Sequence, residues 1–205
     1  MVTRTNPMNT AKPSARERLL DATELFYREG VQSVGIDRII DQAGVAKASL
    51  YNTFGNKEGL VRAYLEARHV IVRERITRTL TRFRTPRERL LGVFDAAGET
   101  VTAPGFNGCA FVAATAEAPR GSAIELAADE HRRWMRGLLV ELAAEAGVAD
   151  PETLARQLHL LYDGAVLCGR MDRDPSAATT ARAAAAVLLD AAEQAATARE
   201  TEKSV

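Results

Sequence analysis

The chain of 205 residues is long enough to bury a substantial core, and a composition that is 46% apolar but only 5% aromatic favours helices over sheets. No apolar run approaches the roughly 18 residues needed to span a bilayer, and the N-terminus lacks the apolar stretch of a signal peptide, so we expect a cytoplasmic protein. The two cysteines, Cys109 and Cys168, are too few for a disulfide framework or a metal cage.

Charge is unevenly distributed along the chain, although the formal net charge is +0. Residues 1–85 hold 15 Lys and Arg against 9 Asp and Glu, a balance of +6, and residues 86–205 carry the compensating −6. A basic N-terminal part suits contact with a polyanion such as nucleic acid, and the acidic remainder indicates a different role. Chance clustering of charges on solvated helix faces is the alternative explanation.

The first 13 residues contain two prolines among small polar residues and show no periodicity, so they are predicted to form a flexible N-terminal arm. Arg4 and Lys12 of this arm, together with Arg16, are candidates for contact with DNA. An amphipathic helix is predicted over residues 14–29, with Gly30 placed to end it.

A second, shorter helix is predicted over residues 36–43, and only residues 44–46 separate it from a third helix that starts at Lys47. A turn of three or four residues that contains glycine, between two short helices, is the signature of the helix-turn-helix motif. Gly44 supplies that glycine. The spacing therefore predicts that the third helix is the one that meets DNA.

The third helix, residues 47–54, carries only two large apolar side chains, Leu50 and Phe54, which are expected to anchor one face. The other faces are polar, as expected of a helix that enters the DNA major groove, where hydroxyl and amide groups read base edges and lysines meet phosphates. Asn56 is predicted to cap the next helix, whose first N–H groups suit a phosphate. The candidate DNA-binding residues are Lys47, Ser49, Tyr51, Asn52, Thr53 and Lys57.

Residues 15–65 resemble the DNA-binding domain of the TetR-type (TetR/AcrR-like) bacterial transcriptional regulators. The resemblance rests on Leu25-Phe26 with Gly30, on Ile39-Ile40, on Ala43-Gly44-Val45-Ala46, on Leu50-Tyr51-Asn52-Thr53-Phe54 and on Lys57-Glu58. It implies an all-α fold with a three-helix helix-turn-helix domain over residues 14–60 and a larger helical domain for ligand binding and dimerisation over residues 61–205.

Two positions depart from the family pattern. Gly35 replaces the usual hydroxyl residue that caps the second helix, and Ala46 replaces the serine that opens the recognition helix. Each change removes a possible phosphate contact, and Ala is a poor capping residue. We therefore expect the same docking on DNA with a weaker grip on its backbone.

A long basic helix is predicted over residues 56–84, with arginines on solvated faces and in ion pairs. Its inward residues are predicted to be Leu60, Tyr64, Ala67, Ile71, Ile76 and Leu80. Thr85-Pro86, Asp150-Pro151 and Asp174-Pro175 each place a capping side chain before a proline, so helices should begin near residues 86, 151 and 175. A short segment over residues 107–118 and a long helix over residues 122–146 are expected between them.

Two apolar stripes near the C-terminus suit close contact between helices. In TetR-type regulators the last two helices of each subunit pair with their twins, so the resemblance implies a homodimer. Burial of both stripes within one subunit is the alternative. The candidate dimerisation residues are Leu154, Leu158, Leu161, Ala165, Cys168, Ala181, Ala185, Leu188 and Ala192.

The middle of the chain concentrates bulky and polar residues, and the resemblance implies a small-molecule pocket there. Such pockets are mostly apolar with a few polar groups, although plain core packing is the alternative for each residue. The candidate ligand-binding residues are Phe94, Phe106, Asn107, Cys109, Phe111, Thr115, His131, Trp134 and Tyr162.

Cys109 carries a more specific hypothesis. It is expected in the first turn of a helix, where the helix dipole lowers a thiol pKa and makes the thiol more reactive. An electrophile or an oxidant would then be the signal that the protein reads. Burial of Cys109 as a small apolar residue is the alternative.

No catalytic constellation, metal site or cofactor motif can be assembled from the sequence: the three histidines fall on separate predicted helices, and there is no glycine-rich phosphate loop or nucleophile elbow. The sequence predicts a dimeric, sequence-specific DNA-binding regulator, in the first place a repressor that a small-molecule effector releases from a palindromic operator. The alternatives are a ligand-independent DNA-organising protein and a helical enzyme on the same fold.

Overall fold

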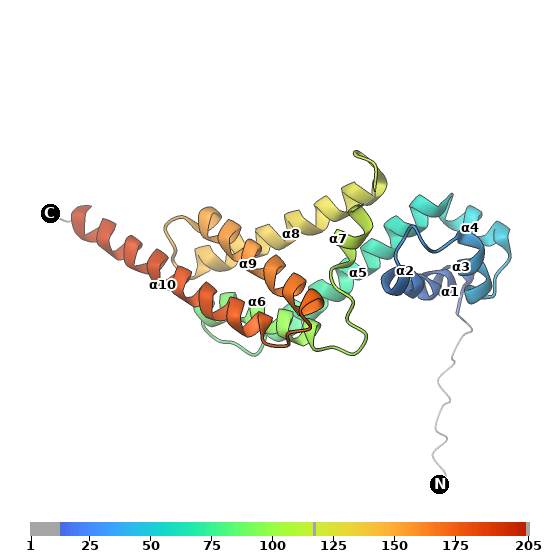
Figure 1. Ribbon diagram of the computed structural model, residues 1–205. Coiled ribbons are helices and arrows are strands. Elements are labelled where there is room, and N and C mark those ends of the chain that lie inside the picture. Colours follow the sequence, from blue (N-terminus) through green and yellow to red (C-terminus); the bar gives the residue numbers. More distant parts are fainter. Residues whose placement is uncertain (1–12, 117, 204–205) are drawn as a thin grey trace, which may run out of the picture. The chain divides into compact units, whose positions relative to one another are not determined.

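The computed structural model describes residues 13–116 and 118–203, and over this part of the chain all the regular elements are helices (Figure 1). The chain divides after Tyr64 into two compact units. The first unit contains α1 (Ala15–Ala22), α2 (Glu24–Glu29), α3 (Ile36–Ala43) and α4 (Lys47–Phe54), and α5 (Lys57–Leu80) begins in it and continues into the second. The second unit adds α6 (Pro86–Val101), α7 (Ala110–Thr115), α8 (Ala123–Glu145), α9 (Pro151–Met171) and α10 (Ala177–Lys203). The predicted all-α fold is confirmed.

The first predicted helix is broken into α1 and α2 at Thr23. The N–H and the hydroxyl of Thr23 both donate to the carbonyl of Leu20, a bond to the third preceding residue that tightens the last turn of α1. The two ends of the predicted segment are as expected: Ser14 and Glu17 form a capping box, and Gly30 ends α2 with φ 94°. Residues 1–12 of the predicted arm, including Arg4 and Lys12, lie outside the described residues.

The long helix α5 is shorter than the predicted 56–84, and its predicted inward stripe is interrupted. Leu60 and Tyr64 are buried in the first unit, and Ile76 and Leu80 are buried in the second. Ala67 and Ile71, predicted inward, are exposed. A single helix that contributes to two cores does not need one continuous apolar face, because each end is buried by different neighbours.

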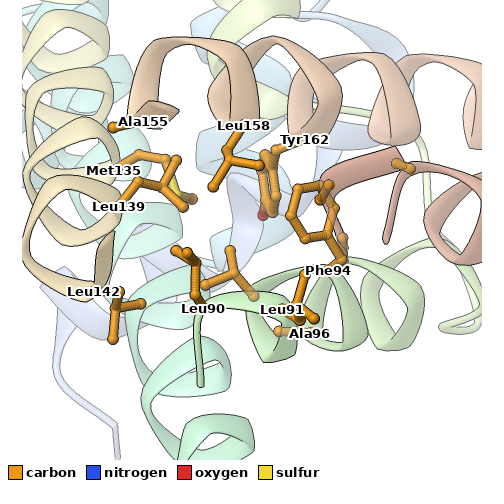
Figure 2. Packing of buried hydrophobic residues seen from close by; sticks show 14 of the residues in the cluster. Leu90, Leu91, Phe94, Ala96, Met135, Leu139, Leu142, Ala155, Leu158 and Tyr162 are labelled. Atoms are coloured by element: carbon orange, nitrogen blue, oxygen red, sulfur yellow. The ribbon is translucent and has the colours of Figure 1, made fainter. Parts of the chain in front are cut away.

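The core of the second unit lies between α6, α8, α9 and α10 (Figure 2). Figure 2 shows Leu90 and Phe94 of α6 facing Met135 and Leu139 of α8 and Leu158 of α9. All five of these side chains are essentially inaccessible to solvent. Burial of so many large aliphatic groups is the main source of stability of the unit.

The predicted helix starts in the second unit are set by local capping. Thr85 forms a capping box ahead of Pro86, and the Asp150 carboxylate accepts from the N–H of Thr153 ahead of α9. Ser122 caps α8 as expected. The helix predicted near residue 175 begins two residues later at Ala177, because the Asp174 carboxylate accepts from the N–H and the hydroxyl of Ser176 and holds a turn there.

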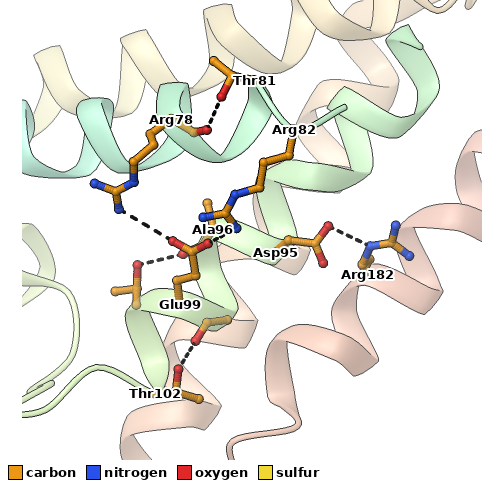
Figure 3. Close-up of polar contacts among 10 residues, drawn as sticks. Arg78, Thr81, Arg82, Asp95, Ala96, Glu99, Thr102 and Arg182 are labelled. Atoms are coloured by element: carbon orange, nitrogen blue, oxygen red, sulfur yellow. Dashed lines mark hydrogen bonds and ion pairs between the residues drawn. The ribbon is translucent and has the colours of Figure 1, made fainter. Parts of the chain in front are cut away.

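Ion pairs connect the surfaces of α5, α6 and α10 (Figure 3). Glu99 of α6 accepts from Arg82 at 2.6 Å, with Arg78 3.8 Å away, and Asp95 accepts from Arg182 of α10 at 3.2 Å. Arg78 lies in α5, and Arg82 follows its end, so the predicted ion pairs of this basic segment form at these two arginines. Such partly exposed pairs add little stability each, typically ~0.2–1 kcal/mol. Their main effect is to fix how the helices pack in the second unit.

Over residues 13–116 and 118–203 the structure has no helix with both the length and the apolarity that crossing a bilayer requires.

Replacing Leu139 by Ala should destabilise the protein far more than replacing Leu126, which lies on the same helix. Leu139 is completely buried, whereas Leu126 is 56% exposed. A cavity at a core leucine costs about 2–5 kcal/mol of unfolding free energy, and a surface truncation costs less than about 0.5 kcal/mol. Urea denaturation followed by circular dichroism, at one protein concentration, measures both. Equal losses would contradict the assignment of the core to these helices.

Candidate functional site

The connection between α3 and α4 has the geometry predicted for a helix-turn-helix motif. Gly44 ends α3 in the left-handed region at φ 60°, and its N–H bonds back to the last turn of α3. The N–H of Val45 donates to the carbonyl of Ile40, which closes the turn. This is a left-handed helix end, for which glycine is the favoured residue. α4 then begins at Lys47, as predicted.

Arg18 of α1 holds this turn from the other side. One terminal nitrogen of its guanidinium (Nη1) donates to the carbonyl of Gly44 at 2.9 Å and to that of Ala43 at 3.3 Å. The carbonyls at a helix C-terminus lack partners within the helix, and a guanidinium satisfies them well. Sequence reasoning missed this residue, because nothing in the spacing of Arg18 links it to a turn 25 residues away.

α4 buries one edge and leaves its polar side chains outward. Leu50 is fully buried, and Phe54 is half-buried with the Arg16 guanidinium 5.9 Å from its ring centre. Tyr51 is 44% exposed, so its side chain is accessible to a partner. Of the candidate DNA-binding residues on this helix, Lys47, Tyr51, Asn52 and Thr53 are exposed and Ser49 is half-buried.

Lys47, at the start of α4, is paired within the protein. Its ammonium donates to the Asp37 carboxylate of α3 at 2.9 Å, and this hydrogen bond and charge raise the pKa of Lys47. Sequence reasoning treated Lys47 as free for a phosphate. Both side chains are largely exposed, so the pair is weak enough for a phosphate to compete for the lysine.

The start of α5 is capped by Asn56, as predicted: its side-chain oxygen accepts from the N–H of Gly59 at 2.8 Å. Lys57 is half-buried, with its ammonium 6.0 Å from the centre of the Phe26 ring, and burial lowers its pKa. Gly59 allows α5 to approach α4, because a Cβ at this position would stand 2.1 Å from the Phe54 carbonyl oxygen. The glycine at residue 59 therefore determines the separation of α4 and α5 there.

In the second unit a cluster of rings surrounds His131 of α8. Its ring stacks on Phe111 of α7 with centroids 3.8 Å apart, and its Nδ1 lies 3.0 Å from Nδ1 of His69 on α5. Trp134 packs edge-on against His69. Burial, followed by the nearby His69, lowers the pKa of His131 to about 3, so the ring is neutral at physiological pH. One of the two facing nitrogens must carry the proton that joins them.

Most of the predicted ligand-binding residues are packed in protein rather than around an open space. Phe94, Phe111 and Tyr162 are buried, and burial raises the pKa of the Tyr162 hydroxyl. Thr115 donates its hydroxyl to the Phe111 carbonyl of its own helix. Trp134 and His131 belong to the ring cluster. Phe94, Phe111, His131 and Tyr162 are thus buried in this structure, as the core-packing alternative describes, whereas Thr115 and Trp134 are half-buried.

The thiol pKa of Cys109 differs from the expected one, and the idea that Cys109 reads an electrophile or an oxidant stays a hypothesis. Cys109 occupies the N-cap position of α7 and is half-buried, and burial is the dominant effect that raises its pKa. The backbone N–H groups of Val112 and Phe111 lower this pKa but do not reverse the shift, and the Cys109 side chain makes no capping hydrogen bond. A thiol with a raised pKa is less reactive at neutral pH, because the thiolate is the nucleophile.

Phe106 and Asn107 differ from the other candidates, because they line a pocket of about 380 Å³. The same pocket is bordered by Gly169 and Arg170 from the end of α9 and by Arg173. The arginines were not among the predicted ligand-binding residues. The one feature of the sequence that could have indicated them is their position next to the turn predicted before Pro175.

The predicted dimerisation stripes lie mostly inside their own subunit. Leu154, Leu158, Ala165, Ala181 and Ala185 are buried in the core, and Leu161, Leu188 and Ala192 are half-buried against it. Only Cys168 is exposed. The apolar spacing of α9 and α10 reflects packing in their own core with α6. The prediction that the buried residues contact a second subunit is therefore wrong. Up to residue 194, the large apolar side chains that these two helices expose are Leu160, Leu167, Met171 and Val187.

Within the described part of the chain, no group of three or more His, Cys, Asp or Glu side chains is arranged to hold a metal ion.

Comparison with known proteins agrees with this geometry. A family model described as bacterial regulatory proteins, tetR family, matches residues 19–64. SCO4454, a TetR-family transcriptional regulator from Streptomyces coelicolor, is 34% identical over 87% of this chain and 95% of its own, with a TM-score of 0.80. The chain belongs to the TetR family. It is therefore a DNA-binding transcriptional regulator, and TetR-family regulators are not enzymes.

Further TetR-family structures share the fold. The sav143 protein of Streptomyces avermitilis, a candidate TetR regulator, is 33% identical over 88% of this chain and 99% of its own, with a TM-score of 0.77. Reduced Escherichia coli NemR, at 24% identity over 83% of this chain and 94% of its own, with a TM-score of 0.74, shows the fold alone. No curated protein matched the sequence.

The TetR family match ends at Tyr64, the residue at which the first compact unit also ends. It covers α2, α3, α4 and the start of α5 together with the second half of α1, from Leu19 onward. Arg18, which holds the turn, is one residue before the match begins. The structure was needed to connect that residue to the motif.

Stability should fall as the pH is lowered from 7 to 5, and His131 should account for part of the loss. In the unfolded chain a histidine gains its proton near pH 6.5, whereas folded His131 stays neutral down to about 3. The unfolded state then binds more protons, so acid favours it, by up to about 1.4 kcal/mol per pH unit from this residue.

Urea titrations of the wild type and of His131→Gln at pH 7 and pH 5 measure this contribution. Loss of the stacked ring lowers the unfolding free energy of the variant at both pH values, so the difference between the two values is the readout. That difference should be smaller in the variant. An unchanged difference would mean that His131 is not a buried neutral group.

Proposed function

We propose that this regulator is a homodimeric repressor that binds a palindromic operator through α4 and is released from it by a small-molecule effector. The observation that carries the proposal is the outward polar face of α4, presented by a turn that Arg18 holds. A helix that buries only Leu50 fully and exposes most of its polar side chains is suited to lie in a major groove.

The residues of α4 divide by chemistry. The amide of Asn52 and the hydroxyl of Tyr51 suit base edges, because amides and hydroxyls carry donors and acceptors in fixed positions. Thr53 already donates its hydroxyl to the Ser49 carbonyl, so it is left to accept or to offer its methyl group to a thymine. Lys47 and Lys57 suit phosphates, and the capped N-terminus of α5 adds backbone N–H groups to the second contact.

A dimer is needed because one helix of eight residues reads only a few base pairs. Two copies of α4 must reach successive major grooves, about 34–36 Å apart, which is why the operator should be palindromic. We assign the dimer contact to the exposed apolar faces of α9 and α10, with Leu160 and Met171 each 72% exposed. Leu160 and Leu167 are two helical turns apart and lie on one face.

An effector would act through α5, the helix that begins at the N-terminal unit and continues into the second. In the second unit His69 of α5 faces His131 of α8, and α8 packs on α9. A molecule that changes how α8 packs therefore also acts on α5. To release DNA, it must bind the DNA-incompetent arrangement more tightly, because equal affinity for both states shifts nothing.

Retention of genomic DNA tests the function as a whole. Purified protein is incubated with sheared DNA of its own genome, retained fragments are sequenced, and the best fragment is titrated by fluorescence anisotropy with and without a metabolite extract. A few palindromic sites, released by the extract, are expected. Retention without sequence preference would instead support the DNA-organising alternative.

Replacing Asn52 by Ala should weaken operator binding more than binding to scrambled DNA, by about 1–3 kcal/mol, because a base contact is lost.

Lys57→Ala should weaken binding to the operator and to scrambled DNA equally, and it should reduce the slope of log K against log salt by about 1. Anisotropy titrations at several salt concentrations measure both effects. Glu141→Ala, an exposed position on α8, is the control and should bind as the wild type does. Equal loss on both DNAs for Asn52→Ala would remove it from base reading.

Replacing Leu167 by Glu should convert the dimer to monomers, because a charge in a buried apolar contact has no partner. Leu126→Glu is the matched control, since Leu126 of α8 is exposed to the same extent, at 56% against 55%. Sedimentation velocity at micromolar concentration measures both, and the monomeric variant should also lose most of its operator affinity. If both variants stay dimeric, the dimer contact lies elsewhere.

A further inference from the structure

The pocket of about 380 Å³ in the second unit is formed where two connections meet. The α6–α7 connection contributes Phe106 and Asn107, and the end of α9 with the α9–α10 connection contributes Arg170, Arg173 and Pro175. Figure 1 shows these two connections at the same end of the unit. The volume lies in the range typical of small-molecule sites.

Close backbone approach forms the back of this pocket. Gly169 of α9 faces Val101 at the end of α6, and a Cβ at position 169 would stand 2.5 Å from a methyl group of Val101. Real side chains do not approach so closely, so only glycine allows α9 and α6 to meet here. The two helices and the connections that follow them are thereby held together around the pocket.

The side chain of Arg170 is held along the pocket wall. Gly108 lies at φ 91°, and a Cβ built on it would be 3.2–3.7 Å from the Cβ, Cγ and Cδ atoms of Arg170. The aliphatic part of the arginine therefore packs on the backbone at Gly108. Packing of the stem restricts where the guanidinium can be, while its charge stays at the pocket.

Arg173 has an uncommon backbone conformation. Its φ is 55°, and in the described part of the chain it is the only residue other than glycine with a positive φ. L-residues with side chains avoid this region, which glycine occupies freely. A glycine would form this turn with less strain, so Arg173→Gly removes the side chain without disturbing the backbone.

Neither arginine has a charge partner. In the described part of the chain neither guanidinium makes a hydrogen bond or an ion pair, and the nearby Asp174 carboxylate is bonded to Ser176 instead. Several arginines of the second unit pair with carboxylates, among them Arg82, Arg87, Arg89, Arg132 and Arg182, whereas Arg133 and Arg136 on the exposed surface of α8 make no pair with a described residue. Two unpaired cations beside one pocket favour an anionic ligand.

The other residues that line the pocket indicate which class of anion it binds. Phe106, Val101 and Pro175 are apolar, and the amide of Asn107 lies among them. An inorganic ion would leave these walls unused. We propose that the pocket binds a small organic carboxylate, whose carboxylate pairs with Arg170 and Arg173 and whose short apolar or aromatic body lies against Phe106. Guanidinium groups suit carboxylates because they can donate two parallel hydrogen bonds.

This inference rests on the proposed function in one respect only: it takes the bound carboxylate to be the effector that releases DNA. Binding to the pocket is measured on the full-length protein without DNA, whereas the proposed function is tested by operator release. The two can therefore fail separately: a protein that binds no carboxylate but leaves its operator on addition of another molecule overturns the inference alone.

Isothermal titration calorimetry of sodium benzoate and sodium hexanoate is the first measurement. The neutral benzamide and hexanamide have the same bodies without the charge, and sodium phosphate has a charge without the body. The wild type should bind at least one carboxylate saturably, at one site per subunit, and bind its amide and phosphate at least about tenfold more weakly, since a hydrogen bond to a charged group typically accounts for such a factor.

Two variants test the site itself. Arg170→Met keeps an apolar stem without the charge, and Arg173→Gly removes the charge at a position whose φ suits glycine, so both should fold. Each should raise the dissociation constant of the bound carboxylate at least about tenfold. Arg133→Met, on an exposed part of α8 away from the pocket, is the matched control and should leave it unchanged.

Several results would overturn the proposal: no binding of either carboxylate, equal binding of acid and amide, equal binding of phosphate, or wild-type affinity in both pocket variants. Thermal unfolding of Arg170→Met and Arg173→Gly without ligand shows whether each is folded. If Arg170→Met does not fold, Arg173→Gly still decides the outcome, because it relieves the backbone rather than straining it.

Discussion

The hydrogen bonds from Arg18 to the carbonyls of Ala43 and Gly44 are the interaction on which the DNA-binding geometry depends. They connect α1 to the turn after α3, and the direction of α4 follows from that turn. The three-residue connection leaves α4 few alternative directions, because Gly44 is already committed to a left-handed conformation. A recognition helix that anchors itself with only Leu50 and Phe54 needs this external support, since its own apolar face is small.

Backbone contacts also fix the other end of α4, where α5 starts. Gly59 permits contact with the Phe54 carbonyl, and Asn56 caps the helix, so α4 is bounded at both ends by backbone contacts rather than by a large hydrophobic interface. The polar surface of α4 is thereby left available. The second unit has the larger core, with aliphatic side chains packed between α6, α8, α9 and α10. The first unit has a smaller core, in which Leu19 and Ile39 are fully buried, and α4 contributes to it chiefly through Leu50.

The second unit also places polar groups inside. His69, His131 and the rings of Phe111 and Trp134 bring α5, α7 and α8 together, and burial keeps His131 neutral. One shared proton joins the two facing imidazoles of this cluster, because two facing ring nitrogens cannot both donate. The pocket at Arg170 and Arg173 differs in kind: it is open, charged and bounded by glycines.

The sequence by itself determined the all-α fold, the family, the bounds of α3 and α4 and most helix starts, because these depend on local patterns: capping side chains, glycines after helices and prolines at first positions. It also determined which side chains of α4 are polar. Only the tertiary structure decided what each apolar stripe packs against. Leu158 and Ala185 follow a seam that suits a second subunit as well as a core, and periodicity alone does not distinguish the two. The pairing of Arg18 with a turn 25 residues away, the raised pKa of Cys109 and the meeting of Arg170 with Phe106 likewise depend on contacts between distant segments, which no local pattern contains.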